Sequence, residues 1–166
     1  KSFQVIAFDI RGHGRSAFSK EPLTYPLIVS DMKHILDHLD IEKAFICGYS
    51  TGGTIALEFL LSEANRASGA IIISGMSEVS DWILKSEIAL GIALAKSKAV
   101  TALALSIAWG NSPNKAFFWK MVREAQKGKA KNMEEYFRYS LSYHCTNQLG
   151  EINHPILLVY GQKDHM

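Results

Sequence analysis

The stretch ICGYSTGG, Ile46 to Gly53, sets a serine between two glycines at the end of an apolar run. Within it, Gly48 to Gly52 matches the pattern G-x-S-x-G, with a predicted strand before it and a predicted helix after it, which is the context this pattern requires. We expect a turn so tight that Ser50 takes a strained backbone conformation, with flanking glycines that remove side chains which would collide. The alternative is a glycine-rich turn without chemistry, because five-residue patterns recur by chance.

In such a turn, Ser50 lies at the start of a helix. The helix dipole and the N–H groups that have no partner there favour developing negative charge. We therefore predict Ser50 as a nucleophile and the N–H of Thr51 as one donor to an oxyanion. Tyr49, on the other side of the serine, is predicted to contact the substrate.

Apolar runs and amphipathic stretches alternate on both sides of this turn. FQVIAFD is a nearly continuous apolar run, as expected for a parallel strand, and Pro26 fits the first turn of the helix that follows. Strands and helices that alternate at this spacing predict an α/β fold, a mostly parallel sheet with helices on both faces. The predicted strands are 3–9, 43–48, 68–75 and a run within 154–164, and the predicted helices between them are 25–40 and 51–64.

Residues 78–147 break this alternation. They read as four consecutive helices, near 81–95, 99–109, 113–127 and 133–144, without a strand signal. We therefore predict a helical cap inserted into a sheet-based core made of residues 1–77 and 148–166.

Composition narrows the classes of function. The chain has 166 residues, 48% hydrophobic, and a formal net charge of +2, which is too small to suggest a nucleic-acid-binding surface. Its apolar stretches are interrupted by lysines and each is shorter than a membrane span. Two cysteines far apart in the sequence favour a reducing, cytoplasmic compartment. We expect a small-molecule substrate as the partner, no nucleic acid, no membrane span and no signal peptide, and the oligomeric state stays open.

The segment FDIRGHGRS, Phe8 to Ser16, follows the first predicted strand. Together with GYSTGG it closely resembles the α/β-hydrolase superfamily, in the branch of esterases, lipase-like enzymes and carbon–carbon hydrolases. The resemblance implies that Asp164, in GQKD, is the acid that orients a catalytic histidine. The alternative for Asp164 is a solvated loop carboxylate, and Glu78 and Asp81 are lesser candidates for the acid.

The histidine of that family follows one more strand, and no residue here matches it. A spacing of four residues between His34 and His38 could suit a metal ion, but no third ligand is evident, so no metal is predicted. The other histidines are His13, His144, His154 and His165. The loop that carries the second oxyanion donor in the family would precede Lys1. We expect residues 1–166 to be part of a longer protein and to be inactive alone.

The resemblance implies a serine hydrolase that cleaves a small apolar ester or related carbonyl compound through an acyl-enzyme on Ser50, without a cofactor. Dehalogenases and epoxide hydrolases of the superfamily normally carry an aspartate at this position, so Ser50 argues against both. Carbon–carbon bond hydrolysis, perhydrolase activity and a non-catalytic ligand-binding role remain as alternatives. The aromatic residues that could line a pocket or pack in the core are Trp82, Trp109, Phe117, Phe118 and Trp119.

Overall fold

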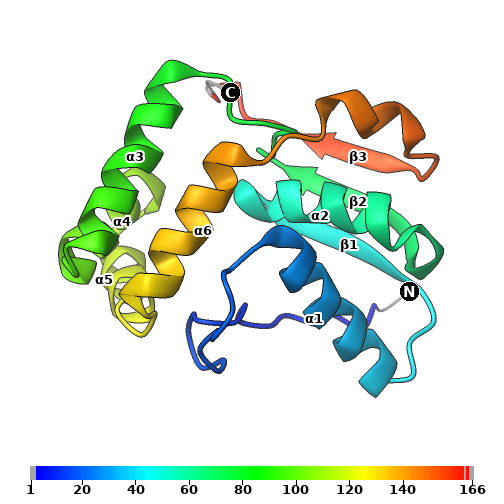
Figure 1. Cartoon of the computed structure of the whole chain (residues 1–166), viewed down its shortest axis with the longest axis horizontal. Helices are drawn as coiled ribbons and strands as arrows, with labels where there is room; N and C mark the ends of the chain where they lie inside the picture. Colours follow the sequence, from blue (N-terminus) through cyan, green and yellow to red (C-terminus); the bar gives the residue numbers. More distant parts are fainter. Residues whose placement is uncertain (1–2, 163, 165–166) are drawn as a thin grey trace. The chain divides into compact units, whose positions relative to one another are not determined.

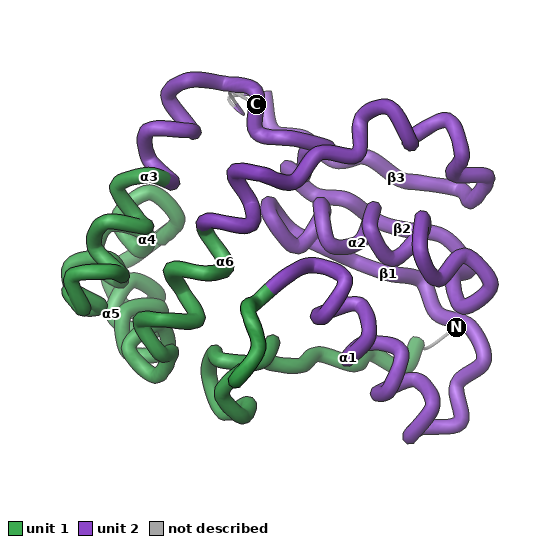
Figure 2. The backbone as a smooth tube through the Cα atoms, viewed as in Figure 1, with its two compact units in different colours: residues 1–23, 89–137 green, residues 24–88, 138–166 purple. Residues whose placement is uncertain are grey.

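The computed structural model of the chain describes residues 3–162 and 164. The chain forms two compact units, drawn in two colours in Figure 2. The first unit comprises residues 1–23 and 89–137, and the second comprises residues 24–88 and 138–166. Helices α3 (Trp82–Lys96) and α6 (Ala130–Ser142) each contribute residues to both units.

The second unit contains a parallel three-stranded sheet. Its strands are β1 (Ala44–Tyr49), β2 (Ala67–Ile73) and β3 (Ile156–Val159), in the order β1-β2-β3. Figure 1 shows these strands running in the same direction. The carboxyl ends of all three strands therefore lie at one edge of the sheet, where α/β folds place their binding sites.

Helices α1 (Tyr25–His38) and α2 (Thr51–Ser62) belong to the same unit. Helix α2 packs on β1 and β2, and α1 packs on α2. The Thr24 hydroxyl caps α1 by accepting the Leu27 N–H at 3.3 Å, and Pro26 lies in the first turn, as predicted. The core between these elements includes Ile28, Phe59, Leu60 and Ile72, all nearly inaccessible to solvent. Short 3₁₀ helices, η1 (Ala64–Arg66) and η2 (Thr146–Glu151), precede β2 and β3.

Three tyrosines tie the last turn of α6 to this core. The ring of Tyr25 contacts the rings of Tyr139 and Tyr143 at centroid distances of 5.0 and 4.8 Å. The Tyr143 hydroxyl donates a hydrogen bond to Glu58 on α2 at 2.7 Å. Burial and this carboxylate raise the pKa of Tyr143, so its hydroxyl remains a donor at all physiological pH values.

The strand predicted over 3–9 is not formed. Residues 3–10 have no regular secondary structure, and their side chains from Phe3 to Asp9 are exposed. A strand exists only where its backbone groups bond to a neighbour, and β1, β2 and β3 pair with one another instead. The apolar run correctly indicates an extended backbone, but the sequence does not show which strand residues 3–9 would pair with.

The helices predicted between residues 78 and 147 are confirmed as α3, α4 (Val100–Asn111), α5 (Lys115–Ala125) and α6. In the first unit they enclose two small apolar clusters. One contains Ala95, Leu103 and Met133, and the other contains Ala104, Ala108 and Val122. No helix in the described part of the chain is long and apolar enough to cross a membrane.

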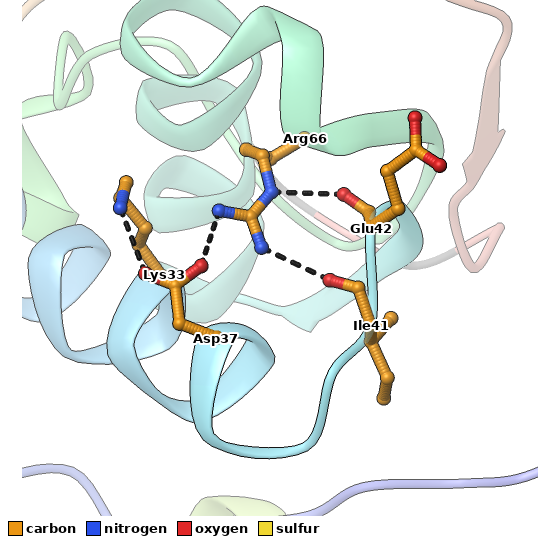
Figure 3. Close-up of polar contacts among 5 residues, drawn as sticks. All are labelled: Lys33, Asp37, Ile41, Glu42 and Arg66. Atoms are coloured by element: carbon orange, nitrogen blue, oxygen red, sulfur yellow. Dashed lines mark hydrogen bonds and ion pairs between the residues drawn. The ribbon is translucent and has the colours of Figure 1, made fainter.

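Arg66 connects η1 to the end of α1 and to the loop that leads into β1 (Figure 3). Its guanidinium donates to the carbonyls of Ile41 and Glu42 at 2.9 and 2.8 Å and to the Asp37 carboxylate at 2.5 Å. Lys33 bonds the same carboxylate at 2.8 Å. Hydrogen bonds from Lys33 and Arg66 hold the pKa of Asp37 below its ordinary value.

We predict that Arg66→Ala in the full-length protein lowers the free energy of unfolding by about 1–2 kcal/mol, because two backbone carbonyls lose a charged donor. Lys33→Ala is the control and should cost less than about 0.5 kcal/mol, since it removes only an exposed i,i+4 pair. Urea unfolding at pH 7 measures both variants. Equal losses in the two would show that Arg66 acts only as a surface ion pair.

The interaction of Asp37 with Arg66 also predicts how the free energy of unfolding depends on pH. A lowered pKa means that the Asp37 contribution is complete above the ordinary value of 3.8 and is lost as the pH falls through the lowered value. The difference in stability between wild type and Arg66→Ala should therefore be smaller at pH 3 than at pH 7. The carbonyl bonds of Arg66 persist at both values, so a remainder should survive at pH 3. Urea unfolding at the two pH values tests this, and a difference that grows on acidification would contradict it.

Candidate functional site

Ser50 stands between the end of β1 and the start of α2 in a left-handed backbone conformation, with φ +52° and ψ −122°. A positive φ is uncommon for a residue with a side chain and costs free energy that the surrounding structure must supply. The strained conformation predicted from the sequence is therefore confirmed. It turns the chain abruptly from strand to helix, and it leaves the half-buried serine without a hydrogen bond from its hydroxyl to any described residue.

Backbone hydrogen bonds hold this turn on both sides. The Ser50 N–H donates to the Ile73 carbonyl at the end of β2 at 2.8 Å, and the Ser50 carbonyl accepts the Gly53 N–H at 2.8 Å. The first bond extends the β1–β2 ladder by one residue, and the second begins the helix. These main-chain hydrogen bonds help to fix the direction in which the Ser50 side chain leaves the backbone.

The two glycines of the pattern differ in what they do. A Cβ on Gly48 would lie 2.0 Å from the Gly52 carbonyl oxygen, so only glycine fits there. A Cβ on Gly52 would meet nothing within 4 Å. The predicted need for glycine on both sides of Ser50 is correct for Gly48 and wrong for Gly52, because the helix at Gly52 turns its Cβ position toward open space.

Two further glycines let α2 begin close to β2. A Cβ on Gly53 would approach Ile72 Cγ2 at 2.8 Å and the Gly75 Cα at 3.0 Å. The buried hydroxyl of Thr54 donates to the Met76 carbonyl at 2.8 Å. The start of the helix is therefore fixed to the segment that leaves β2.

Thr51 and Tyr49 flank the serine as the sequence indicates. Thr51 is the first residue of α2, where backbone N–H groups have no acceptor within the helix. Tyr49 is the last residue of β1, paired in register with Ile73, and its side chain is 59% exposed. Both are neighbours of Ser50 at the edge of the sheet.

Asp164 follows β3 in a tight turn. Its Oδ2 accepts the Gly161 N–H at 2.8 Å and the Ser74 hydroxyl at 2.7 Å, and its own N–H donates to the Gly161 carbonyl at 3.1 Å. Ser74 itself follows β2 with φ +47°, and its N–H donates to the Val159 carbonyl at 2.9 Å. The carboxylate is therefore oriented by donors from β2 and β3 together.

The structure thus brings Ser50 and Asp164 to the same edge of the sheet, on the two strands that flank β2. A hydrogen bond from the Tyr160 hydroxyl to the Gly75 carbonyl at 2.6 Å adds a second link between the ends of β2 and β3. Sequence reasoning missed Ser74. Its only signal was its position directly after an apolar strand.

The lesser candidates for the acid have other partners. Glu78 Oε1 accepts the Thr146 hydroxyl at 2.7 Å, and the Glu78 backbone forms an isolated bridge with His144. Asp81 precedes α3, and its carboxylate accepts the Leu84 N–H at 2.9 Å, which is the bond of a helix cap. Neither carboxylate is held by the ends of β2 and β3 as Asp164 is.

The described histidines are spread over several elements. His34 and His38 lie on α1, and no group of three potential ligands that could hold a metal ion occurs among residues 3–162 and 164. His13 belongs to the first unit, where its Nδ1 lies 3.2 Å from the Arg11 carbonyl and burial lowers its pKa. The buried Nδ1 of His154 has no hydrogen-bond partner in the described structure. His165 lies outside the described residues.

The RGHGRS segment forms a closed loop in the first unit. The Asp9 carboxylate accepts the Arg15 N–H at 3.0 Å, and its backbone carbonyl accepts the Ser16 hydroxyl. A Cβ on Gly14, which has φ +52°, would collide with Asp9 at 2.3 Å. The aspartate, serine and second glycine of the pattern therefore serve to close this loop.

Asn132 on α6 fixes the end of the same loop. This buried side chain accepts the Ser19 N–H and donates to the Ser19 carbonyl, both at 3.2 Å, and also donates to Glu135 at 3.1 Å. The Gly12 carbonyl accepts the Lys129 N–H at 3.1 Å. The sequence analysis missed these contacts because they join residues more than a hundred positions apart.

The aromatic candidates for a substrate pocket fall into two groups. Phe118 packs against the cluster of Ala104, Ala108 and Val122. The others are exposed, and they are Trp82, Trp109, Phe117 and Trp119. Core packing therefore accounts for one of the five.

We predict that Gly48→Ala destabilises the full-length protein by at least about 2 kcal/mol, because the new methyl group overlaps the Gly52 carbonyl. Gly52→Ala, two positions from the serine on its other side, should leave stability unchanged or raise it slightly, since alanine favours a helix. Urea unfolding of the two variants provides the comparison. Equal stability would show that the turn can open without cost.

The sequence of this chain is similar to those of known hydrolases. Residues 1–94, more than half of the chain, match the model of the alpha/beta hydrolase fold family. The 3-oxoadipate enol-lactonase 1 of Acinetobacter baylyi is 26% identical over 98% of this chain and 62% of its own length. An sn-1-specific diacylglycerol lipase of Danio rerio is 36% identical over 42% of this chain and 22% of its own length.

Solved structures resemble most of this chain. An esterase from Exiguobacterium antarcticum has a TM-score of 0.79 at 17% identity and covers 90% of this chain. An enol-lactonase from Burkholderia xenovorans has a TM-score of 0.78 at 19% identity and covers 93%. This chain spans 60% of each of those two chains. The strained serine at the end of β1, the parallel sheet around it and the family match agree, and the chain belongs to the α/β-hydrolase fold family.

Proposed function

We propose that the full-length protein is a serine hydrolase and that Ser50 is its nucleophile. The observation that carries this proposal is the backbone of Ser50, which has a positive φ between a strand and a helix and a hydroxyl without a partner among the described residues. Strain of this kind persists where the surrounding structure imposes it, and it is concentrated at functional sites. A purely structural turn at this position could use glycine and avoid the cost.

In the proposed reaction, Ser50 Oγ attacks the carbonyl carbon of the substrate while a histidine accepts the hydroxyl proton. The Thr51 N–H donates to the oxyanion that forms, aided by the α2 dipole. The histidine then returns the proton to the leaving alcohol, and water releases the acyl group from Ser50. We propose that this histidine belongs to a part of the protein outside residues 1–166.

The role we propose for Asp164 is to accept the N–H of that histidine and to stabilise its charged form. Hydrogen bonds from the Ser74 hydroxyl and the Gly161 N–H to Oδ2 support this role, because they fix the direction of the carboxylate. Ser74 then acts as a positioning residue. Tyr49, next to Ser50 and exposed, is proposed to contact the substrate.

For the substrate we propose a small apolar ester or a related carbonyl compound. The similar proteins are named as a lactonase, a diacylglycerol lipase and putative carbamate hydrolases, and each of these names describes cleavage of a bond between a carbonyl carbon and a heteroatom. A carbon–carbon bond hydrolase or a perhydrolase would use the same nucleophile, and a ligand-binding protein of this fold would not need the histidine.

We propose that residues 78–147 form the cap of the full-length protein and that residues 1–77 and 148–166 belong to its core. A cytoplasmic location is proposed from the cysteines, because Cys47 and Cys145 are both free thiols. No cofactor enters the proposed reaction.

We predict that Ser50→Ala lowers the turnover of short p-nitrophenyl esters by the full-length protein at least about 1,000-fold and abolishes its labelling by a fluorophosphonate. Ser62→Ala, at the last residue of the same helix, is the matched control and should keep both. Labelling that persists in a folded Ser50→Ala protein would place the nucleophile elsewhere.

The ligand-binding alternative is tested by the remainder of the protein. If the enzyme proposal is correct, the full-length sequence contains, after Met166, a further strand followed by a loop with a histidine, and replacing that histidine by alanine should abolish ester hydrolysis. A full-length sequence with no histidine in that loop would contradict the enzyme proposal.

A further inference from the structure

Charge is divided unevenly between the two units. Residues 89–137 of the first unit contain eight Lys or Arg and three Asp or Glu, whereas residues 24–88 of the second unit contain four and nine. The small net charge of the whole chain hides this difference. Helix α5 carries much of the positive charge, with Lys115, Lys120 and Arg123 exposed and without an ion pair among the described residues.

Helix α4 lies antiparallel to α5. Thr101, near the start of α4, accepts a hydrogen bond from Gln126 at the end of α5, while Ser112, just after α4, contacts Met121. Ala104 and Ala108 of α4 pack against Val122 of α5. These contacts define the buried side of each helix, and the remaining positions of each helix can be placed from them at about 100° per residue.

One flank of this helix pair carries exposed aromatic and basic side chains together. Leu105 and Trp109 follow one another at a spacing of four on α4, and Lys115, Trp119 and Arg123 do so on α5. The helical repeat, counted from the buried contacts, places both rows on the same side of the pair. We name this set, Leu105, Trp109, Lys115, Trp119 and Arg123, the α4–α5 face.

Exposure of the α4–α5 face is large for such apolar side chains. Trp109 is 85% exposed and Trp119 is 53% exposed. The twelve residues of α4 include no charged side chain. Among the described residues, nothing covers the exposed Trp109 with apolar atoms and nothing pairs with the charges of Lys115 and Arg123 beside it.

We propose that the α4–α5 face binds the surface of an anionic phospholipid bilayer. Tryptophan and leucine side chains partition into the region between head groups and acyl chains, and lysine and arginine extend their charges to the lipid phosphates. Each basic residue near such a surface contributes attraction that depends on salt. An acidic protein surface would satisfy the charges but would leave Trp109 without an apolar environment.

The experiment is co-sedimentation of the full-length Ser50→Ala protein with vesicles, so that binding is measured apart from hydrolysis. The vesicles are phosphatidylcholine alone or phosphatidylcholine with 30% phosphatidylglycerol, a probe composition of about one anionic lipid in three. We expect binding to the anionic vesicles only, weakened by high salt, with a blue shift of tryptophan fluorescence. The triple variant Lys115→Gln, Lys120→Gln, Arg123→Gln removes the two basic residues of the α4–α5 face and the third exposed basic residue of α5, and should lower the affinity about 100-fold. Trp109→Ala should lower it at least about fivefold.

The matched control removes the same charge from the second unit, as Lys33→Gln, Lys43→Gln and Lys85→Gln, and should bind as the parent does. Equal binding to neutral and anionic vesicles, or equal losses in the two triple variants, would overturn the proposal. So would binding to soluble polyglutamate with the affinity seen for vesicles, since that would indicate an acidic protein as the partner. If the full-length protein binds neither kind of vesicle while the wild-type protein still hydrolyses esters, this inference alone is overturned and the proposed function stays intact.

Discussion

Parallel pairing of three strands is the constraint on which the candidate site depends. Ser50, Ser74 and Asp164 come from three separate parts of the sequence, and each follows a strand whose carboxyl end lies at the same edge of the sheet. The ladders continue past the strands, since the Ser50 N–H bonds to Ile73 and the Ser74 N–H bonds to Val159. A shift in register at either pair would therefore separate the serine from the carboxylate. Site geometry and sheet register are in this sense one property of the fold.

Strain at Ser50 is balanced by the contacts around it. A residue with positive φ relaxes if the chain on either side is free to move. Here Gly48 approaches the backbone of Gly52, and Gly53 approaches Gly75, so that α2 begins within van der Waals distance of the segment after β2. The Thr54 hydroxyl bonds to that segment as well. The small residues after the serine thus serve the packing of the helix, and the packing of the helix maintains the conformation of the serine.

Local pattern was enough to predict most elements of this fold. Helices α1 to α6 and strands β1 to β3 lie within a few residues of the predicted ranges, because an apolar or amphipathic run bounded by turn residues marks each of them. The strand expected over 3–9 failed because an apolar run does not specify its neighbour. Ser74 and Asn132 were missed for a related reason: their hydrogen bonds join residues 90 and 113 positions apart. The role of Gly52 was predicted wrongly, because the G-x-S-x-G pattern contains two glycines and does not show which of them is under steric constraint.

The loop with the sequence RGHGRS shows how a family pattern can be explained without assigning it chemistry. The Asp9 carboxylate accepts the Arg15 N–H, and the Asp9 carbonyl accepts the Ser16 hydroxyl, so these bonds close the loop. A side chain at Gly14 would collide with Asp9. A Cβ at Gly12 would lie 2.5 Å from the Cβ of Asn132, so glycine lets the chain pass this residue. His13 within this loop has its pKa lowered by burial and its ring against Tyr136 at 5.6 Å, so it is neutral at physiological pH and packs as an aromatic side chain. The loop and the residues just after it form hydrogen bonds with Lys129 and Asn132 of the first unit. The conformation of the loop therefore depends on α6 and the residues that precede it. A substitution at Asn132 therefore acts on a segment that precedes it by more than a hundred residues, although the two are adjacent in the folded unit.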